Sequence, residues 1–103
     1  MKIVFHSNVE RFIRSLQKPT IAKLLHMLDL LEVYGKHLGM PHVKFLENGI
    51  WELRVRGRQE VRILFAFVQE RVVCLHGYIK KSQRMPRAEL ETAKQRLRNL
   101  TAI

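Results

Sequence analysis

The spacing of apolar residues changes partway along this chain, and that change limits the folds that the chain can adopt. In the first third, apolar residues recur every three or four positions, as on one face of a helix: Phe12, Ile13, Leu16, Ile21, Leu24, Leu25, Leu28 and Leu31. From residue 50 they alternate with polar residues, as in a strand with one buried face. A chain of 103 residues with this order of patterns is expected to form a single α+β domain, residues 1–103.

The first third is predicted to contain a short strand and two helices. Lys2–Phe5 is an apolar run typical of an opening strand. Ser7 and Glu10 match a capping box, in which each side chain binds a free backbone N–H near the other, and the helix that it opens should stop near Pro19. A second helix should follow Pro19 and end at Gly35, so that the two helices form an antiparallel hairpin.

The remainder is predicted to form three consecutive strands and a last helix. The strands are Ile50–Val55, Val61–Val68 and Arg71–Lys80, bounded by the polar turns Asn48-Gly49, Arg56–Gln59 and Gln69-Glu70. The last helix should begin at Pro86 and carry one apolar stripe, formed by Leu90, Ala93, Leu97 and Leu100. We therefore expect a helical hairpin and a C-terminal helix packed on a small antiparallel sheet.

The charge of the chain is the first indication of function. Nineteen Lys and Arg against nine Asp and Glu give a formal net charge of +10. So strong a positive field in a small domain attracts polyanions, which favours nucleic acid, a ribosome or an acidic protein as the partner. A basic surface that serves only solubility is the alternative. A membrane surface is disfavoured, because no helical pattern has the strongly basic face that lipid binding needs.

Several other classes of function have no support in the sequence. The five His residues show no metal-ligand spacing, and no glycine-rich phosphate loop occurs, so we expect no metal and no cofactor. The single cysteine, Cys74, lies within a predicted strand and is expected to be an inert thiol. Without a signal region, an apolar span or a possible internal disulfide, the chain is expected in the cytoplasm.

Strand alternation predicts that polar residues gather on one face of the sheet. Trp51, Leu53 and Val55 on the first strand, Ile63, Phe65 and Phe67 on the second, and Val73, Leu75 and Ile79 on the third are assigned to the core. The opposite side then carries Arg54, Arg62 and, on the third strand, Cys74, His76, Tyr78 and Lys80. Five of these residues, Arg54, Arg62, His76, Tyr78 and Lys80, would suit a phosphodiester site.

These residue types match the chemistry of RNA cleavage. When a 2′-hydroxyl attacks the neighbouring phosphate, arginines can stabilise the developing charge through paired contacts with its oxygens. His76 can act as an acid or base near neutral pH, Lys80 is a second candidate, and Tyr78 can stack on a displaced base. Each residue taken alone has a structural alternative, such as a solvated charge or a half-buried histidine, so the hypothesis depends on their convergence.

Four segments resemble a known family. LENGIWELR at 46–54, VRILFAFV at 61–68, VVCLHGYIKK at 72–81 and the following QRMPRAELETAKQR are similar in order and spacing to the HigB-like, phage-related branch of the RelE toxin superfamily. The resemblance spans roughly residues 1–100. It implies a RelE-like fold and a metal-independent endoribonuclease, or mRNA interferase, that cleaves mRNA on the ribosome as the toxin of a type II toxin–antitoxin module.

The resemblance also implies a set of site residues and partners. By motif, it makes Arg54, Arg62, Lys80 and Lys81 the cationic set, with His76 and Gln83 nearby. Together with strand alternation and the basic turns, this gives Arg54, Arg62, His76 and Lys80 as catalytic candidates and Arg56, Arg58, Tyr78, Lys81, Gln83 and Arg84 as RNA-binding candidates. Several relatives use an aromatic residue near the C-terminus, and the segment LRNLTAI has none, so the resemblance does not identify the acid and base; His76 and Lys80 are the hypothesised pair. The partners would be mRNA, the ribosome and a cognate antitoxin with a helix-turn-helix, which alone would contact operator DNA. A catalytically inactive RNA- or protein-binding module of the same fold, or a structural partner in a larger complex, remains the alternative.

Overall fold

A computed structural model describes residues 1–101 of the chain. The described elements run β1 (Lys2–Phe5), α1 (Ser7–Arg14), α2 (Lys18–Tyr34), the short 3-10 helix η1 (Gly35–His37), β2 (Val43–Glu47), β3 (Ile50–Val55), β4 (Val61–Val68), β5 (Arg71–Ile79) and α3 (Arg87–Thr101). The strands form one five-stranded sheet in the order β1-β5-β4-β3-β2. The predicted α+β class, with helices on a small and mostly antiparallel sheet, is confirmed.

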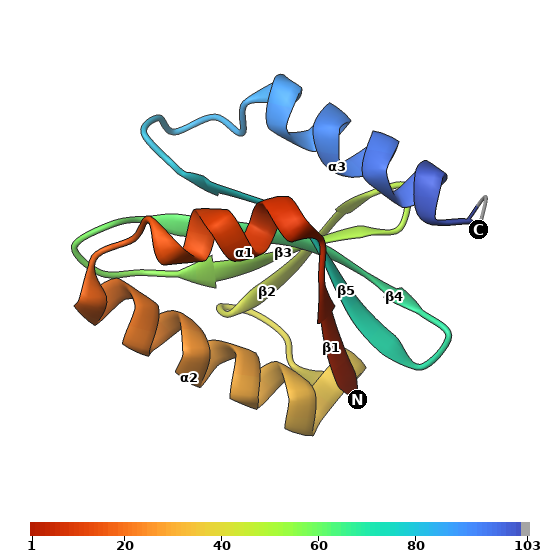
Figure 1. The fold of residues 1–103 in the computed structure, drawn as a ribbon, viewed down its shortest axis with the longest axis horizontal. Coiled ribbons are helices and arrows are strands. Elements are labelled where there is room, and N and C mark those ends of the chain that lie inside the picture. The colour runs from red at the N-terminus through yellow and green to blue at the C-terminus, as the bar shows by residue number, and fades with distance from the viewer. Residues whose placement is uncertain (102–103) are drawn as a thin grey trace.

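The sheet lies between two layers of helices. Figure 1 shows α1 and α2 running in opposite directions, the predicted hairpin, with α3 separated from them by the strands. Apolar residues of α1 and α2 pack with Leu53, Ile63 and Phe65 in one core, whereas Leu90 and Ala93 of α3 pack with Leu64 in another. Both faces of the sheet are therefore covered, and a site on the α3 face must lie where this helix leaves the strands open.

The predicted helix boundaries need two corrections. The N-cap of α1 is His6, whose Nδ1 accepts a hydrogen bond from the backbone N of Asn8 at 3.2 Å, so the capping box of Ser7 and Glu10 is wrong. An imidazole nitrogen here replaces the hydroxyl oxygen that usually takes this role. Helix α2 begins at Lys18 and contains Pro19 in its first turn, where a proline costs no hydrogen bond.

The buried stripe of α2 is rotated relative to the prediction. Thr20, Leu24, Met27, Leu28 and Leu31 are buried, at spacings of three and four residues. Leu25, which was assigned to the stripe, is 51% exposed. Met27, which was not part of the predicted stripe, is buried next to Leu28. The buried face of α2 is therefore shifted towards Met27 and away from Leu25.

Two strands of the sheet differ from the predicted meander. β2 pairs antiparallel with β3 through the two-residue turn Asn48-Gly49, in which both residues have positive φ, as the turn prediction requires. The prediction had not resolved β2 as a strand. β1 pairs with β5 in parallel, so the sheet is mixed at this edge. The chain can return in the same direction because α1, α2 and the strands that follow lie between the two.

A β-bulge in β5 corrects the assignment of faces. Leu64 pairs with His76, but Phe65 pairs with Cys74, so Leu75 is an extra residue on β5. Cys74 therefore lies in the α1–α2 core, whereas Val73 and Leu75 lie in the α3 core, the reverse of the prediction. Alternation assumes a continuous ladder, and one extra residue inverts it for half of the strand.

Candidate functional site

Glu52, Arg54 and Arg62 form a charged cluster on the α3 face of the sheet. Arg54 of β3 pairs directly with Arg62 of β4 in the ladder. The carboxylate of Glu52, two residues before Arg54, lies between them: Oε1 is 3.0 Å from Nε of Arg54 and Oε2 is 3.9 Å from Nε of Arg62. Like charges on directly opposed residues repel, and this carboxylate offsets the repulsion.

Arg62 is almost completely buried, with a side-chain exposure of 3%. Its NH1 donates to the carbonyl of Val61 at 3.0 Å and to Oε2 of Glu60 at 3.2 Å. Its Nε makes no hydrogen bond within the part of the chain that the structure describes. A buried guanidinium is costly unless it is paired, so these contacts hold the side chain in one position, while the buried Nε donor is left unused.

A basic groove lies beside Arg62, where β4 begins and β5 ends. Its volume is about 430 Å³, and it is lined by Arg56, Glu60, Arg62, Lys80, Lys81, Ser82 and Gln83. The turn between β3 and β4 supplies one wall, and the segment after β5 supplies the other. The two segments lie next to each other because Val61, at the start of β4, pairs with Ile79, at the end of β5. Five of the ten predicted site residues therefore lie together: Arg56, Arg62, Lys80, Lys81 and Gln83.

His76 lies under α3 and contacts two of its charged residues. Nε2 of His76 is 3.2 Å from Oε2 of Glu89, and Nδ1 is 3.1 Å from NH1 of Arg96. The guanidinium can donate only to an unprotonated Nδ1, which places the single ring proton on Nε2, facing Glu89. Burial lowers the pKa of His76, Glu89 opposes that shift, and Arg96 adds to it. Nδ1 is engaged by Arg96, and Nε2 is buried beside Glu89 without a hydrogen bond among the described residues, so in this arrangement the imidazole has no exposed position for exchanging a proton with RNA.

Tyr78 is also covered in this structure. It is 6% exposed, and its ring is stacked with that of His76 at a centroid distance of 6.2 Å. Burial, with a contribution from Glu52, raises the pKa of Tyr78 to about 12. The phenol is therefore protonated at physiological pH, and its ring is not available to a base while α3 is in place.

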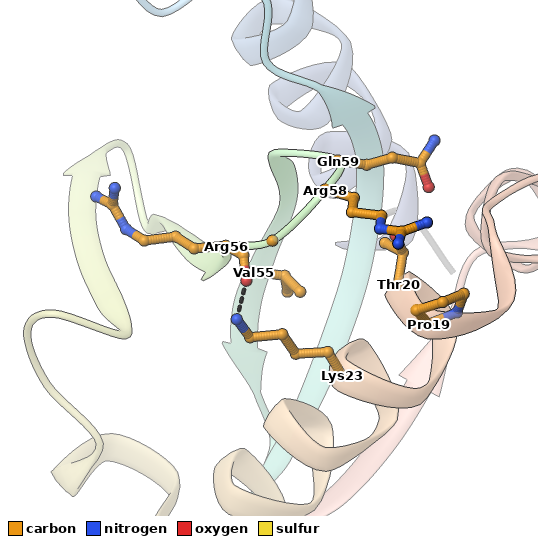
Figure 2. A pocket seen from close by; sticks show the side chains of 8 residues that line it. Pro19, Thr20, Lys23, Val55, Arg56, Arg58 and Gln59 are labelled. Carbon is orange, nitrogen blue, oxygen red and sulfur yellow. Dashed lines mark hydrogen bonds between the residues drawn. The ribbon is translucent and has the colours of Figure 1, made fainter.

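The three other predicted site residues lie outside the groove. Arg54, held by Glu52, lines a side pocket of about 170 Å³ with Lys23, Met27, Pro41, His42 and Arg56. Arg58 lies across the β3–β4 turn from the groove, and Figure 2 shows Arg56 and Arg58 extending to opposite sides of this turn. Arg84 is exposed in the loop before α3, where its carbonyl accepts a hydrogen bond from the hydroxyl of Ser82 at 3.0 Å.

The sequence reasoning missed the acidic residues of the site. Glu52 and Glu60 bind the arginines, and Glu89 binds His76. Alternation did place Glu52 on the same strand face as Arg54, so its role had a signal. Glu60 lies in a turn and Glu89 on a distant helix, and neither position follows from strand alternation.

The described residues contain few features of other kinds of site. Within residues 1–101, no group of three or more His, Cys, Asp or Glu side chains could hold a metal ion. Cys74 is buried, and burial raises the pKa of its thiol to about 12. In the same residues, no helix combines the length and the apolar character needed to cross a membrane.

Comparison with known proteins gives one family and two similar structures. A family model described as phage-derived protein Gp49-like (DUF891) matches residues 11–98. The fold is similar to a chain of the heterotetrameric YoeB–YefM toxin–antitoxin complex from Staphylococcus aureus, with a TM-score of 0.54 and 15% identity over 72% of this chain and 90% of that chain.

A second YoeB–YefM complex from the same organism gives a TM-score of 0.57 at 15% identity, covering 80% of this chain and 97% of the matched one. At this identity the likeness establishes the fold. No curated protein sequence matches the chain.

Proposed function

Since the chain belongs to the phage-derived Gp49-like family, we propose that it is the toxin of a toxin–antitoxin pair. Its fold is that of a chain in the YoeB–YefM toxin–antitoxin complexes, which supports this assignment. The four sequence segments that resemble the HigB-like branch of the RelE superfamily point in the same direction. The net charge of +10 suits a protein that acts on a polyanion.

The activity that we propose is metal-independent endonucleolytic cleavage of RNA. The 2′-oxygen of one nucleotide attacks the adjacent phosphorus while the bond to the 5′-oxygen of the next nucleotide breaks. The products are a 2′,3′-cyclic phosphate and a free 5′-hydroxyl. The observation that carries the proposal is the basic groove, in which the preorganised guanidinium of Arg62 faces the same space as Lys80 and Lys81.

The groove supports different roles for its residues. Arg62 would stabilise the charge that develops on the phosphate, because its position is fixed by Glu52 and Glu60 before RNA binds. Arg54, which the carboxylate of Glu52 also holds in place, would add to the positive potential at the site. Lys80 is the stronger candidate for proton transfer, since it lines the groove, whereas His76 would need α3 to move first. Arg56, Lys81, Gln83, Arg58 and Arg84 would bind the RNA backbone, and Tyr78 would stack on a base only in a rearranged state.

The proposal extends to partners and place of action. The substrate would be mRNA on the ribosome, in the cytoplasm. The antitoxin would cover the basic groove with acidic residues, because only a partner of opposite charge neutralises it without leaving buried cations unpaired. It would carry a helix-turn-helix and bind operator DNA, with the toxin attached to it.

The alternative is a module that binds RNA or protein without cleaving. The surroundings of His76 favour it, since Arg96 engages one nitrogen of this candidate catalytic imidazole and the other is buried beside Glu89. This module would retain the basic groove and its affinity for polyanions.

Induced expression followed by mapping of new RNA 5′ ends tests the proposal. Expression without a partner should arrest growth and produce new 5′ ends within translated messages. Arg62→Lys and Lys80→Ala should each lower the rate of cleavage by roughly 10²–10³-fold, the usual cost of losing one group that stabilises the transition state. Arg71→Ala is the matched control, because Arg71 is exposed at the opposite end of β5.

Purified protein with and without translating ribosomes separates the possibilities. Cleavage only with ribosomes supports the ribosome-dependent form of the proposal. RNA binding without cleavage in either condition would support the non-cleaving alternative. If the folded Arg62→Lys and Lys80→Ala variants cleaved as fast as Arg71→Ala, the groove would not be the site.

A further inference from the structure

Three cavities meet at Arg56, and together they extend the positive surface beyond the basic groove. Arg56 lines the groove, the side pocket and a third cavity of about 120 Å³, which we call the helix pocket. The helix pocket lies between the start of α2 and the β3–β4 turn, and its lining includes Thr20, Lys23, Arg56, Arg58 and Gln59. A polyanion lying in the groove could therefore continue past Arg56 to the helix pocket without leaving the basic surface.

The helix pocket has fixed walls. The ammonium group of Lys23 donates to the carbonyl of Arg56, the contact drawn as a dashed line in Figure 2. The backbone N of Gln17, just before α2, donates to Oε1 of Gln59 at 3.0 Å. These two contacts attach the β3–β4 turn to α2 at both of its ends. The pocket therefore exists before a ligand binds, which reduces the entropic cost of binding.

The charge in the helix pocket is uncompensated. Lys23, Arg56 and Arg58 are among its lining residues, and no acidic residue is. The side chain of Arg56 extends to the other side of the turn, so the cations available to a ligand in the pocket are those of Lys23 and Arg58. None of the ion pairs among residues 1–101 includes any of these three cations. The groove, by contrast, contains Glu60. A group of cations in a partly enclosed cavity without a carboxylate favours an anionic ligand.

We propose that the helix pocket binds a backbone phosphate of the RNA substrate, one that lies several nucleotides from the phosphodiester in the groove, with Lys23 and Arg58 as its ligands. This inference rests on the proposed function, and it specifies that the substrate is a single strand long enough to reach from the groove past Arg56. An RNA strand is favoured over an acidic protein segment because the proposed substrate in the groove is RNA, and Arg56 lines both the groove and the helix pocket, so the same strand can continue from one to the other. Arg58 presents the planar fork that fits two phosphate oxygens.

Binding of RNA that cannot be cleaved tests this proposal on the intact protein. The probes are fluorescent 2′-O-methyl oligonucleotides of about 3 and about 8 nucleotides, whose affinity is followed by anisotropy as a function of salt. Lys23→Gln and Arg58→Gln should each weaken binding of the longer probe about 3–10-fold and reduce the slope of log K against log salt by roughly 0.7, the value for one lost phosphate contact with a single strand. Binding of the shorter probe, which the groove alone can hold, should stay unchanged.

Two variants and one control keep the test informative. Lys23 also holds the carbonyl of Arg56, so its replacement changes the turn as well as the charge. Arg58 makes no hydrogen bond or ion pair within residues 1–101, so Arg58→Gln removes charge alone. Lys2→Gln is the control, because Lys2 is exposed beside the other end of α2, where the N-terminus donates to the carbonyl of Glu32.

The outcomes separate this proposal from the proposed function. Unchanged affinity and salt slope for the longer probe in both variants would overturn the helix pocket as an RNA site, even if the protein cleaves RNA. Variant-dependent binding by a protein that never cleaves would support the pocket and overturn the nuclease activity. If both variants lost affinity for a poly-glutamate peptide and kept it for the longer RNA, the pocket would bind an acidic protein segment, and the proposal would be wrong.

Discussion

Glu52 is the residue on which the geometry of the charged cluster depends. It is 3% exposed, as is Arg62, and its two oxygens face the guanidinium groups of Arg54 and Arg62. Without this carboxylate, two arginines paired directly across the ladder would repel each other in a region of low dielectric constant. Glu52 is therefore a positioning residue, which holds the two arginines in place.

Replacing Glu52 should destabilise the fold more than replacing the other carboxylate that holds Arg62. Glu52→Gln should lower the free energy of unfolding by about 3 kcal/mol, since it removes the buried carboxylate that both Arg54 and Arg62 face. Glu60→Gln should cost less than about 1 kcal/mol, because the side chain of Glu60 is 41% exposed. Urea unfolding monitored by the fluorescence of Trp51, the single tryptophan, measures both.

The double variant Glu52→Gln/Arg62→Gln completes a thermodynamic cycle. Its destabilisation should be smaller than the sum of the two single losses, because the guanidinium of Arg62 and the carboxylate that faces it are removed together. If the two losses were additive, the side chains of Glu52 and Arg62 would not interact, and the positioning role assigned to Glu52 would be wrong.

At the residue scale, the sequence predicted which cations share a face but not what holds them. Arg54, Arg62, His76 and Tyr78 do lie on the α3 side of the sheet, as alternation indicated. Their partners Glu60 and Glu89 come from a turn and a helix, and such contacts depend on tertiary packing that no local pattern encodes. Strand alternation also could not indicate that α3 covers His76 and Tyr78 on this face.

At the scale of elements, the packing of α1 on the sheet depends on Gly77 in β5. A Cβ built on Gly77 would lie 2.4 Å from Cδ2 of Phe12 and 2.9 Å from Cδ1 of Ile63. Real side chains do not approach so closely, so this glycine allows α1 to lie directly on the strand that carries His76 and Tyr78.

Gly77→Ala should therefore lower the free energy of unfolding by about 1–3 kcal/mol through overpacking. Gly39→Ala is the matched control, because a Cβ at Gly39 would meet nothing within 4 Å. Thermal unfolding of the two variants in the same buffer measures the difference. Equal stability of both variants would contradict the tight contact between α1 and β5.

The elements themselves were predictable to the extent that their signals are local. The two helices of the hairpin, the strands β3, β4 and β5, and α3 follow from apolar spacing and from turn residues such as Asn48 and Gly49. The bulge at Leu75 and the parallel pairing of β1 do not, because both depend on which strands meet in the sheet. The exposed and charged β2 gave too weak an apolar alternation to be recognised.

At the scale of the whole molecule, two histidines couple its stability to pH. His6 caps α1, and His76 links β5 to α3. Burial lowers the pKa of both, and Arg96 lowers both further; Arg11 adds to the shift at His6, whereas Glu89 opposes it at His76. Each therefore holds a proton less readily in the folded chain than in the unfolded chain, where the pKa is about 6.5.

The fold should consequently lose stability as the pH falls below that value. Between pH 7 and pH 5 the unfolded chain binds more protons than the folded one, so the free energy of unfolding should decrease as the pH is lowered through about 6.5. His76→Gln and His6→Gln should each flatten this dependence in thermal unfolding scans. The lowered pKa of Glu47 acts only in more acidic solution, below its ordinary value of 4.5. A variant whose pH dependence matched that of the parent protein would exclude its histidine as a source.

The extra residue at Leu75 lets one strand serve two incompatible surroundings. Before this residue, Cys74 lies in the α1–α2 core and Val73 in the α3 core. After it, His76 and Tyr78 lie on the same face of the sheet as Arg62. A chain shortened by this single residue could satisfy one half of β5 only by inverting the other. Loss of one codon here would thus force a choice between an intact interior and an assembled cationic site, although every remaining amino acid would be the same.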